Sequence, residues 1–187
     1  MSNETRQCRI CKETKPLEMM ELDSRRKDKR QNRCQACKNA SHDKAARAYH
    51  HLRHRSPLPV EVTPAEIRLL FEMFQGSCAY CSKRPDNESQ LHLEHIVPLS
   101  ESGRNTLSNL ITACASCNRK KQVKPLVTHF LDNRDRFSDD NMALVIEYMA
   151  LLTGSKKEAV AAELTDEHIS YELKQKVKAI EKEARTT

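Results

Sequence analysis

The chain is poor in the residues that build a large apolar core. Its 187 residues include no tryptophan, three glycines, 4% aromatic residues and 38% hydrophobic residues. This supply is thin for one large core, so the composition favours several small modules. The chain also lacks a long apolar run, and its opening residues, MSNETRQCRI, lack the apolar centre of a secretory signal. We therefore expect a cytoplasmic protein without membrane contact.

No cysteine stands alone. All eight fall into Cys-x-x-Cys pairs, which are Cys8/Cys11, Cys34/Cys37, Cys78/Cys81 and Cys114/Cys117. In a reducing compartment such pairs are typical of metal ligands, and four thiolates close a tetrahedral zinc site without an open position for substrate. We expect two structural Zn²⁺ sites, the first built from the two pairs before residue 40 and the second from the two pairs after residue 77. A disulfide scaffold is the alternative.

Acidic residues are scarce in the first third of the chain. Residues 1–59 carry 15 Lys/Arg against 7 Asp/Glu, whereas residues 125–187 carry 9 against 12. The basic residues between Cys11 and Cys34 include Arg25, Arg26, Lys27, Lys29, Arg30 and Arg33. A basic end on an otherwise balanced chain indicates nucleic acid as a partner, bound through its phosphates. A solvated basic face is the alternative.

Punctuating residues divide the chain into four parts. We expect a basic four-cysteine module at residues 1–55, a proline-containing linker at 56–62, a third part at 63–124 and a helical region at 125–187. Thr63, Pro64 and Glu66 predict a capped helix start, with Gly76 as its end. In the last part Thr165 is expected to start a final helix, whose apolar stripe would serve packing or dimerisation.

The stretch LHLEHIVP, residues 91–98, predicts a β-strand that ends at a proline. Regular alternation along this strand would send Glu94 and His95 to opposite faces. A Glu-His pair is weak evidence of a site by itself, because such pairs are common on protein surfaces.

The wider pattern carries more information. An acidic residue and His95 are followed by Ile-x-Pro-Leu-Ser, a glycine-bearing loop, Asn109-Leu110 and Cys-x-x-Cys-Asn with a later Lys. Across residues 76–124 this pattern resembles HNH endonucleases of the ββα-metal fold. The resemblance implies an α+β protein: a ββα-metal nuclease core with a structural four-cysteine zinc, preceded by a second four-cysteine zinc module and followed by helices. The N-terminal cysteines are similar to zinc knuckles that precede nuclease modules in phage proteins.

The resemblance also implies roles for individual residues. His95 would be the general base, Glu94 and Asn118 would hold one catalytic Mg²⁺ or Mn²⁺, and Asn109 would steady the histidine loop. The family hydrolyses DNA to 5′-phosphate and 3′-hydroxyl ends. The chemistry is consistent, because a neutral imidazole can accept a proton from water at neutral pH and oxygen ligands suit these hard cations. We expect Arg104, Arg119, Lys120 and Lys121 to contact phosphates.

Three positions depart from the family's usual pattern. Glu94 replaces a frequent aspartate, Asn118 stands where histidine is common, and Arg104 occupies the place of a second glycine. The chain is thus an H-N-N variant, and its amide ligand favours Mg²⁺ or Mn²⁺ over softer metals.

Two other functions fit parts of the sequence. A non-catalytic, zinc-dependent DNA-binding protein would explain the cysteines and the charge. An adaptor of a phage DNA-packaging complex would explain the C-terminal helices, which could equally form a homodimer or bind a phage or host protein. A bacterial or phage-infected cell is the expected setting.

Overall fold

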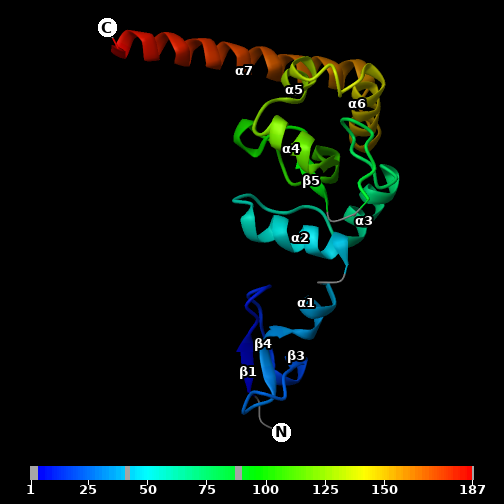
Figure 1. Ribbon diagram of the computed structural model, residues 1–187, viewed down its shortest axis with the longest axis vertical. Coiled ribbons are helices and arrows are strands. Elements are labelled where there is room, and N and C mark those ends of the chain that lie inside the picture. Colours follow the sequence, from blue (N-terminus) through cyan, green and yellow to red (C-terminus); the bar gives the residue numbers. More distant parts are fainter. Residues whose placement is uncertain (1–3, 41–42, 87–89, 187) are drawn as a thin grey trace.

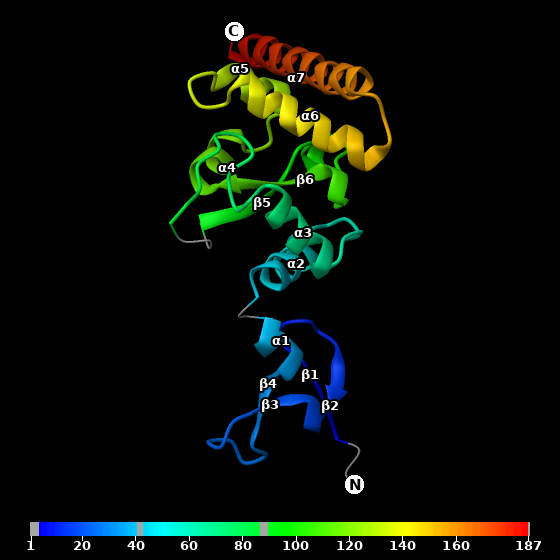
Figure 2. The same cartoon turned by 90° about the vertical axis from the view of Figure 1, so that its right-hand side faces the viewer.

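The computed structural model describes residues 4–40, 43–86 and 90–186. The small N-terminal strands lie at one end of an elongated molecule, and the long helix α7 (Lys157–Thr186) lies at the other (Figures 1 and 2). Buried apolar side chains form two separate clusters. The smaller one consists of Cys8, Cys11, Met20, Cys34 and Cys37, and the larger one extends through the rest of the described chain.

The N-terminal module is made of two short hairpins and one helix turn. Strand β1 (Thr5–Gln7) pairs antiparallel with β2 (Thr14–Pro16), and β3 (Met20–Leu22) pairs antiparallel with β4 (Arg30–Cys34). The 3₁₀ turn η1 (Leu17–Met19) joins the hairpins, and α1 (Gln35–Ala40) follows β4. The apolar core of the N-terminal module is too small to stabilise the module by burial alone. Its stability therefore depends on the cluster of four cysteines.

Helix α2 (Lys44–Arg55) packs on the larger of the two buried clusters. Asp43 caps it by accepting hydrogen bonds from the N–H groups of Ala45 and Ala46. Ala45 is buried in the larger cluster, and Ala48, Tyr49 and Leu52 pack against that cluster. The segment after α2 is also bound to the larger part of the molecule, since the N–H of Glu61 donates to the carbonyl of Asn105 at 3.0 Å.

Helix α3 (Pro64–Met73) begins as the sequence predicts. The Thr63 side chain accepts from the N–H of Glu66, and the Glu66 carboxylate accepts from the N–H of Thr63, which completes a capping box. The helix ends at Met73, two residues before the chain turns through left-handed backbone at Gln75 and Gly76, whose φ angles are 50° and 66°.

A ββα unit occupies the middle of the molecule. Strand β5 (Leu91–His95) pairs antiparallel with β6 (Leu110–Cys114), so that Leu91 lies opposite Cys114 and His95 opposite Leu110. The connection contains the 3₁₀ turns η3 (Leu99–Glu101) and η4 (Leu107–Asn109). Helix α4 (Ala115–Lys121) follows β6 directly. The α+β fold, the ββα core and the two four-cysteine groups expected from the sequence are therefore confirmed.

Helices α5 (Leu126–Asp132), α6 (Asp139–Thr153) and α7 cover one side of this unit. The Tyr148 hydroxyl of α6 lies within hydrogen-bond distance of the carbonyls of Leu107 and Leu110, at 2.6 and 2.9 Å. Within the described ranges, none of the helices combines the length and the apolar character needed to span a bilayer.

The expected helix start at Thr165 is wrong. Helix α7 begins at Lys157 and continues through Thr165, whose hydroxyl donates to the carbonyl of Ala161 at 2.7 Å. The hydroxyl finds its partner one turn back within the helix and so does not need to cap a new one.

Candidate active site

The eight cysteines form two clusters, as their spacing predicts. In each cluster the four sulfur atoms lie within 4.8 Å of one another. One comprises Cys8, Cys11, Cys34 and Cys37, and the other comprises Cys78, Cys81, Cys114 and Cys117. The second joins the turn before β5 to the junction of β6 and α4. It therefore lies at the open end of the hairpin, where Leu91 is opposite Cys114, and both groups are suited to a tetrahedral metal ion.

Hydrogen bonds favour the thiolate form of one cysteine in each cluster, whereas burial raises the pKa of Cys11, Cys37 and Cys81, and the hydrogen bond with Cys78 raises that of Cys117. The N–H groups of Ile10 and Cys34 point at the sulfur of Cys8 at 3.4 and 3.3 Å. Burial alone would raise the pKa of Cys8, but backbone hydrogen bonds outweigh it and lower this pKa to about 6. In the second cluster a hydrogen bond from Cys117 is the main reason that the pKa of Cys78 falls to about 5. Thiolates are the form that binds metal.

Glu94 and His95 lie on opposite faces of β5, as alternation predicts. The Glu94 side chain is directed toward α4, where its Oε1 accepts from Lys121 Nζ at 3.1 Å. The Lys121 side chain is 0% exposed and also donates to the carbonyl of His95 at 2.7 Å, while the Glu94 side chain is 11% exposed. Burial raises the pKa of Glu94 and lowers that of Lys121, and each charge partly offsets the shift of the other.

A hydrogen bond to Asn105 holds the imidazole of His95. His95 Nε2 lies 2.9 Å from Asn105 Oδ1, and Asn105 is completely buried. The amide nitrogen of Asn105 faces Ser56 Oγ and the carbonyls of Leu58 and Pro59 at 2.7, 3.2 and 3.0 Å. Two of these partners are pure acceptors, so the amide cannot be flipped and Oδ1 must face the ring. Nε2 of neutral His95 therefore carries the proton, which leaves Nδ1 as the basic nitrogen.

Burial also keeps this imidazole neutral. Desolvation lowers the pKa of His95, and the nearby charge of Lys121 lowers it further, while the bond to Asn105 acts in the opposite direction. A neutral ring with a defined basic nitrogen is the form that a general base requires.

Asn109 closes the loop that follows the histidine strand. Its Oδ1 accepts from the N–H of Val97 at 2.8 Å, and its Nδ2 donates to the carbonyls of Val97 and Arg104 at 3.0 and 2.9 Å. Gly103 lies inside this loop, where a Cβ atom would be 2.0 Å from the Val97 carbonyl oxygen. The close approach requires glycine at that position.

Asn118 lies on α4, one turn before Lys121, and therefore on the same side of the helix. It lines a groove together with residues of α2 and β5, including Leu91 and Leu93. Because Lys121 contacts Glu94, the side of α4 that carries Asn118 also faces the strand that carries Glu94.

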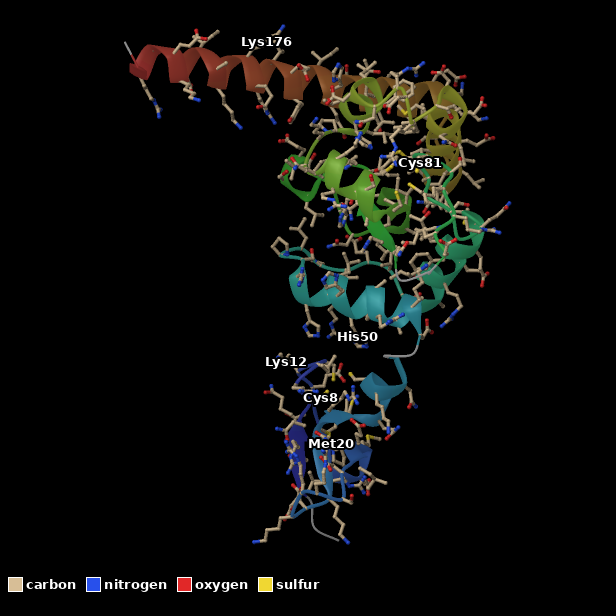
Figure 3. All side chains as sticks on the ribbon, viewed as in Figure 1. Cys8, Lys12, Met20, His50, Cys81 and Lys176 are labelled. Atoms are coloured by element: carbon tan, nitrogen blue, oxygen red, sulfur yellow. The ribbon has the colours of Figure 1, made fainter. Side chains whose placement is uncertain are left out.

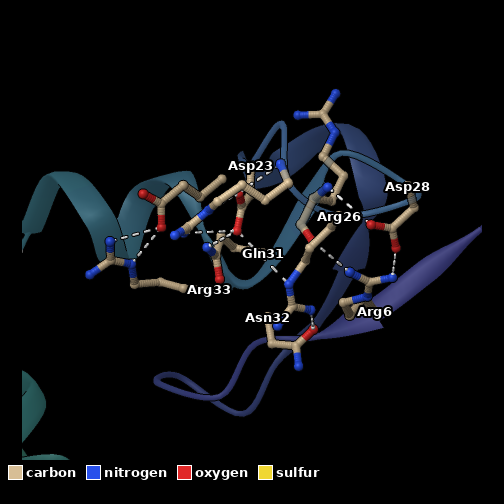
Figure 4. A network of polar contacts seen from close by, with 10 residues as sticks. Arg6, Asp23, Arg26, Asp28, Gln31, Asn32 and Arg33 are labelled. Carbon is tan, nitrogen blue, oxygen red and sulfur yellow. Dashed lines mark hydrogen bonds and ion pairs between the residues drawn. The ribbon is translucent and has the colours of Figure 1, made fainter.

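Most basic side chains of the N-terminal loop have partners within the module (Figure 4). Arg25 Nε lies 3.0 Å from Asp23, and Arg26 donates to Asn32 at 3.2 Å. Arg30 donates to the carbonyl of Met20 at 2.9 Å, and Arg33 donates to Glu21 at 2.8 Å. These bonds shape the loop, so its six basic residues are not six equal phosphate contacts. Lys27 and Lys29 are exposed.

The expected phosphate contact by Lys121 is wrong. This lysine is completely buried against Glu94 and cannot reach a nucleic acid. Its neighbours Arg119 and Lys120 are exposed, because they lie on the face of α4 that is turned away from β5. Arg104 is 68% exposed, and its guanidinium donates twice to Glu61, at 3.0 and 2.7 Å.

Asn105 is the site residue that sequence reasoning missed. Its only signal was a position in the loop between Gly103 and Asn109, which Arg104 and Thr106 share. Its role depends on the chain after α2, some fifty residues earlier in sequence, and no local pattern reveals that contact.

The model of the HNH endonuclease family, described as "HNH endonuclease", matches residues 78–124. Among solved structures, the crystal structure of the Type II-C Cas9 enzyme from Actinomyces naeslundii is similar with a TM-score of 0.39 and 18% sequence identity. That match covers 72% of this chain but only 14% of the Cas9 chain. No curated protein matches.

Proposed function

Because residues 78–124 carry an HNH endonuclease domain, we propose that this protein is a metal-dependent endonuclease that hydrolyses phosphodiester bonds of DNA. The products would be 5′-phosphate and 3′-hydroxyl ends, and the cytoplasm of a bacterial or phage-infected cell would be the setting. The observation that carries the proposal is the bond between His95 Nε2 and Asn105, which leaves a basic nitrogen on the histidine that the family uses as its base.

The residues around β5 and α4 fit a catalytic Mg²⁺ or Mn²⁺. The carboxylate of Glu94 and the amide of Asn118 are hard oxygen donors; Glu94 is bonded to Lys121 of α4, and Asn118 lies one turn before Lys121 on that helix. Only Oε1 of Glu94 is bonded to Lys121, and the side chain retains some exposure. When bound, such an ion would supply Lewis-acid stabilisation of the phosphate charge.

The chain's own residues account for the other requirements of hydrolysis. His95 Nδ1 would accept the proton of the attacking water, while Asn105 holds the ring through Nε2. Asn109 keeps the loop after β5 closed, so that the backbone beside His95 stays fixed. The thiolates of Cys78, Cys81, Cys114 and Cys117 would hold a structural Zn²⁺ that ties the turn before β5 to the junction of β6 and α4, and the N-terminal cysteines would hold a second Zn²⁺.

Replacement of the base tests the proposal. We expect His95→Ala to lower the rate of plasmid nicking by about 100-fold or more. DNA binding by the same variant, measured by fluorescence anisotropy, should remain close to that of the original chain. His54→Ala is a matched control, because His54 is an exposed histidine of α2. Cleavage by His95→Ala at the original rate would contradict the assignment.

The non-catalytic alternative predicts a different result. A purely DNA-binding zinc protein would bind DNA and show no nicking with added Mg²⁺ or Mn²⁺. An adaptor or dimer role for the C-terminal helices is compatible with nuclease activity. The exposed stripe of Ile169, Leu173, Val177 and Ile180 on α7 supports that additional role.

A further inference from the structure

A groove of about 350 Å³ separates α2 from β5. Helix α2 contributes Lys44, Arg47 and His51 to one wall, and the opposite wall contains Leu91, His92, Leu93 and Asn118. His50 lies on the other side of α2, toward the N-terminal module (Figure 3). The groove therefore lies on the face of α2 that is turned toward the candidate active site.

The charge of this groove is of one sign. Helix α2 carries four Lys/Arg and three histidines and no acidic residue, and the side chains that line the groove include no carboxylate. Arg47, His51 and Arg55 are spaced by four residues, so they form one stripe along the helix. All three are exposed, and within the described residues neither Arg47 nor Arg55 forms an ion pair with a carboxylate. Arg53, on another face, pairs with Glu13.

The stripe leads along β5 toward His95. At its beginning, Lys44 Nζ lies 4.0 Å from the centre of the Phe71 ring, beside Leu91 in the groove. At its end, the chain that follows α2 is bonded through Ser56 and Leu58 to Asn105, which in turn holds His95. Leu91, His92 and Leu93 of β5 line the groove, and His95 follows two residues further along the same strand. A ligand that follows the groove would thus reach the proposed base.

The apolar part of the groove distinguishes between two forms of nucleic acid. Leu52, Phe71, Leu91 and Leu93 lie between the cationic stripe and the strand. In a duplex the base faces are stacked on one another, and a protein meets phosphates, sugars and base edges. An unpaired strand also offers its base faces, which favour grooves that combine cationic and aromatic side chains.

The geometry points to this groove as a binding site for an unpaired DNA strand. The phosphates would lie on Arg47, His51 and Arg55, and the bases would contact Phe71 and Leu93. The strand would enter past Lys44 and reach His95 at the end of α2. This inference rests on the proposed nuclease function for the identity of the ligand as DNA, but binding can be measured without cleavage.

Charge reversal on the stripe tests the site. The zinc-loaded full chain with His95→Ala is titrated, without added Mg²⁺, into labelled DNA of about 30 nucleotides, single-stranded or as its duplex. We expect Arg47→Glu/Arg55→Glu to weaken single-strand binding by at least about 10-fold, and to reduce the slope of log affinity against log salt by about 1.4. The charge-matched control is Lys176→Glu/Lys178→Glu on α7, which should stay within about twofold.

Two further measurements keep the test decisive. Arg47→Ala/Arg55→Ala replaces the charge-reversal variant if the reversed charges disturb the fold. Circular dichroism checks that this variant is folded, and we expect it to bind the single strand more weakly than the His95→Ala chain does. A photo-crosslinking residue in place of His51 should label the single strand. If both stripe variants bind DNA with unchanged affinity, the proposed site is contradicted. If the duplex binds more tightly than the single strand and its binding is weakened equally by the stripe substitutions, an unpaired strand as the ligand is contradicted. If the original chain cleaves no DNA, the proposed function fails while these binding results stand.

Discussion

At the residue scale, the site depends on polar groups that are held by buried partners. Asn105 is fully buried and joins His95 to the chain after α2, and Lys121 is fully buried beneath Glu94. Buried polar groups cost free energy unless they are paired, so such networks hold their members in one arrangement. The orientation of the candidate base is therefore set by residues that do not touch a substrate.

Loss of Asn105 should impair catalysis more than folding. We expect Asn105→Ala to lower kcat by about 10- to 100-fold, because the ring of His95 loses the partner that orients it. Nitrogen NMR of the histidines should show a mixture of tautomers for His95. The control is Asn133→Ala, since Asn133 is also buried and its Nδ2 donates to the carbonyl of His129 at 2.9 Å. Equal kcat values for both variants would show that Asn105 has only a structural role.

The buried lysine of α4 should matter for stability. Lys121→Met leaves the Glu94 carboxylate without its cation, so we expect the free energy of unfolding to fall by about 3 kcal/mol. Lys120→Met changes an exposed neighbour of the same helix and should cost less than about 0.5 kcal/mol. Chemical denaturation measures both. A Lys121→Met variant as stable as Lys120→Met would show that the pair contributes little.

At the element scale, short elements are positioned by the longer ones that pack on them. Strands β5 and β6 have five residues each and α4 has seven, and such pieces are not stable in isolation. Helix α6 fixes the turn before β6 through Tyr148, and α2 flanks the groove beside β5. The helices around the ββα unit are therefore part of the site's support.

The docking of α7 should depend on pH. Burial, and then the charge of Glu163, raises the pKa of Glu167 to about 7, and the Oε2 atom of Glu167 is buried without a hydrogen-bond partner. Between about pH 4.3 and 7 the folded chain keeps a proton that the unfolded chain has released, so stability falls as pH rises through this window.

Removal of that carboxylate should remove the pH effect. At about pH 8 we expect Glu167→Gln to stabilise the protein by about 1 kcal/mol, a value reduced for partial solvation, and by much less at about pH 4. Thermal unfolding at several pH values measures the difference. Glu181→Gln, an exposed change further along α7, is the control and should have little effect. An identical pH dependence of Glu167→Gln and the original chain would refute the explanation.

At the scale of the whole molecule, two cysteine clusters serve two different cores. The N-terminal cluster forms most of a small core with Met20, whereas the second lies within the large core that includes α2, α3, α6 and α7. The two parts make few contacts, such as the ion pair between Arg53 and Glu13. Loss of one cluster should therefore leave much of the other part folded.

Cysteine replacement tests this modularity. We expect the chain to bind two Zn²⁺ ions, and Cys37→Ser to bind one while the main thermal transition is retained, because its cluster lies in the smaller core. Cys117→Ser should also bind one ion but lose the main transition. Metal analysis and calorimetry report both properties. Loss of the main transition in Cys37→Ser would mean that the two parts fold as one unit.

Local patterns in the sequence determined much of this protein. Paired cysteines predict four-thiolate clusters and a capping box predicts the start of α3, while the resemblance of residues 76–124 to HNH endonucleases implies the ββα unit. These features depend on contacts between residues that are close in sequence, or on the spacing of cysteines and motif residues within a single module. They could be predicted because their physical causes lie within short stretches of chain.

Only the tertiary structure decided how these parts serve one another. The positive charge of Lys121 predicts a phosphate contact, but this lysine is buried against Glu94. Asn105 has the sequence context of an ordinary loop residue, but it holds His95. The segment after α2 resembles a free linker, yet it is bonded to that asparagine. In each case the partner comes from a distant part of the chain. The burial and hydrogen bonding that define the residue's role therefore exist only after folding.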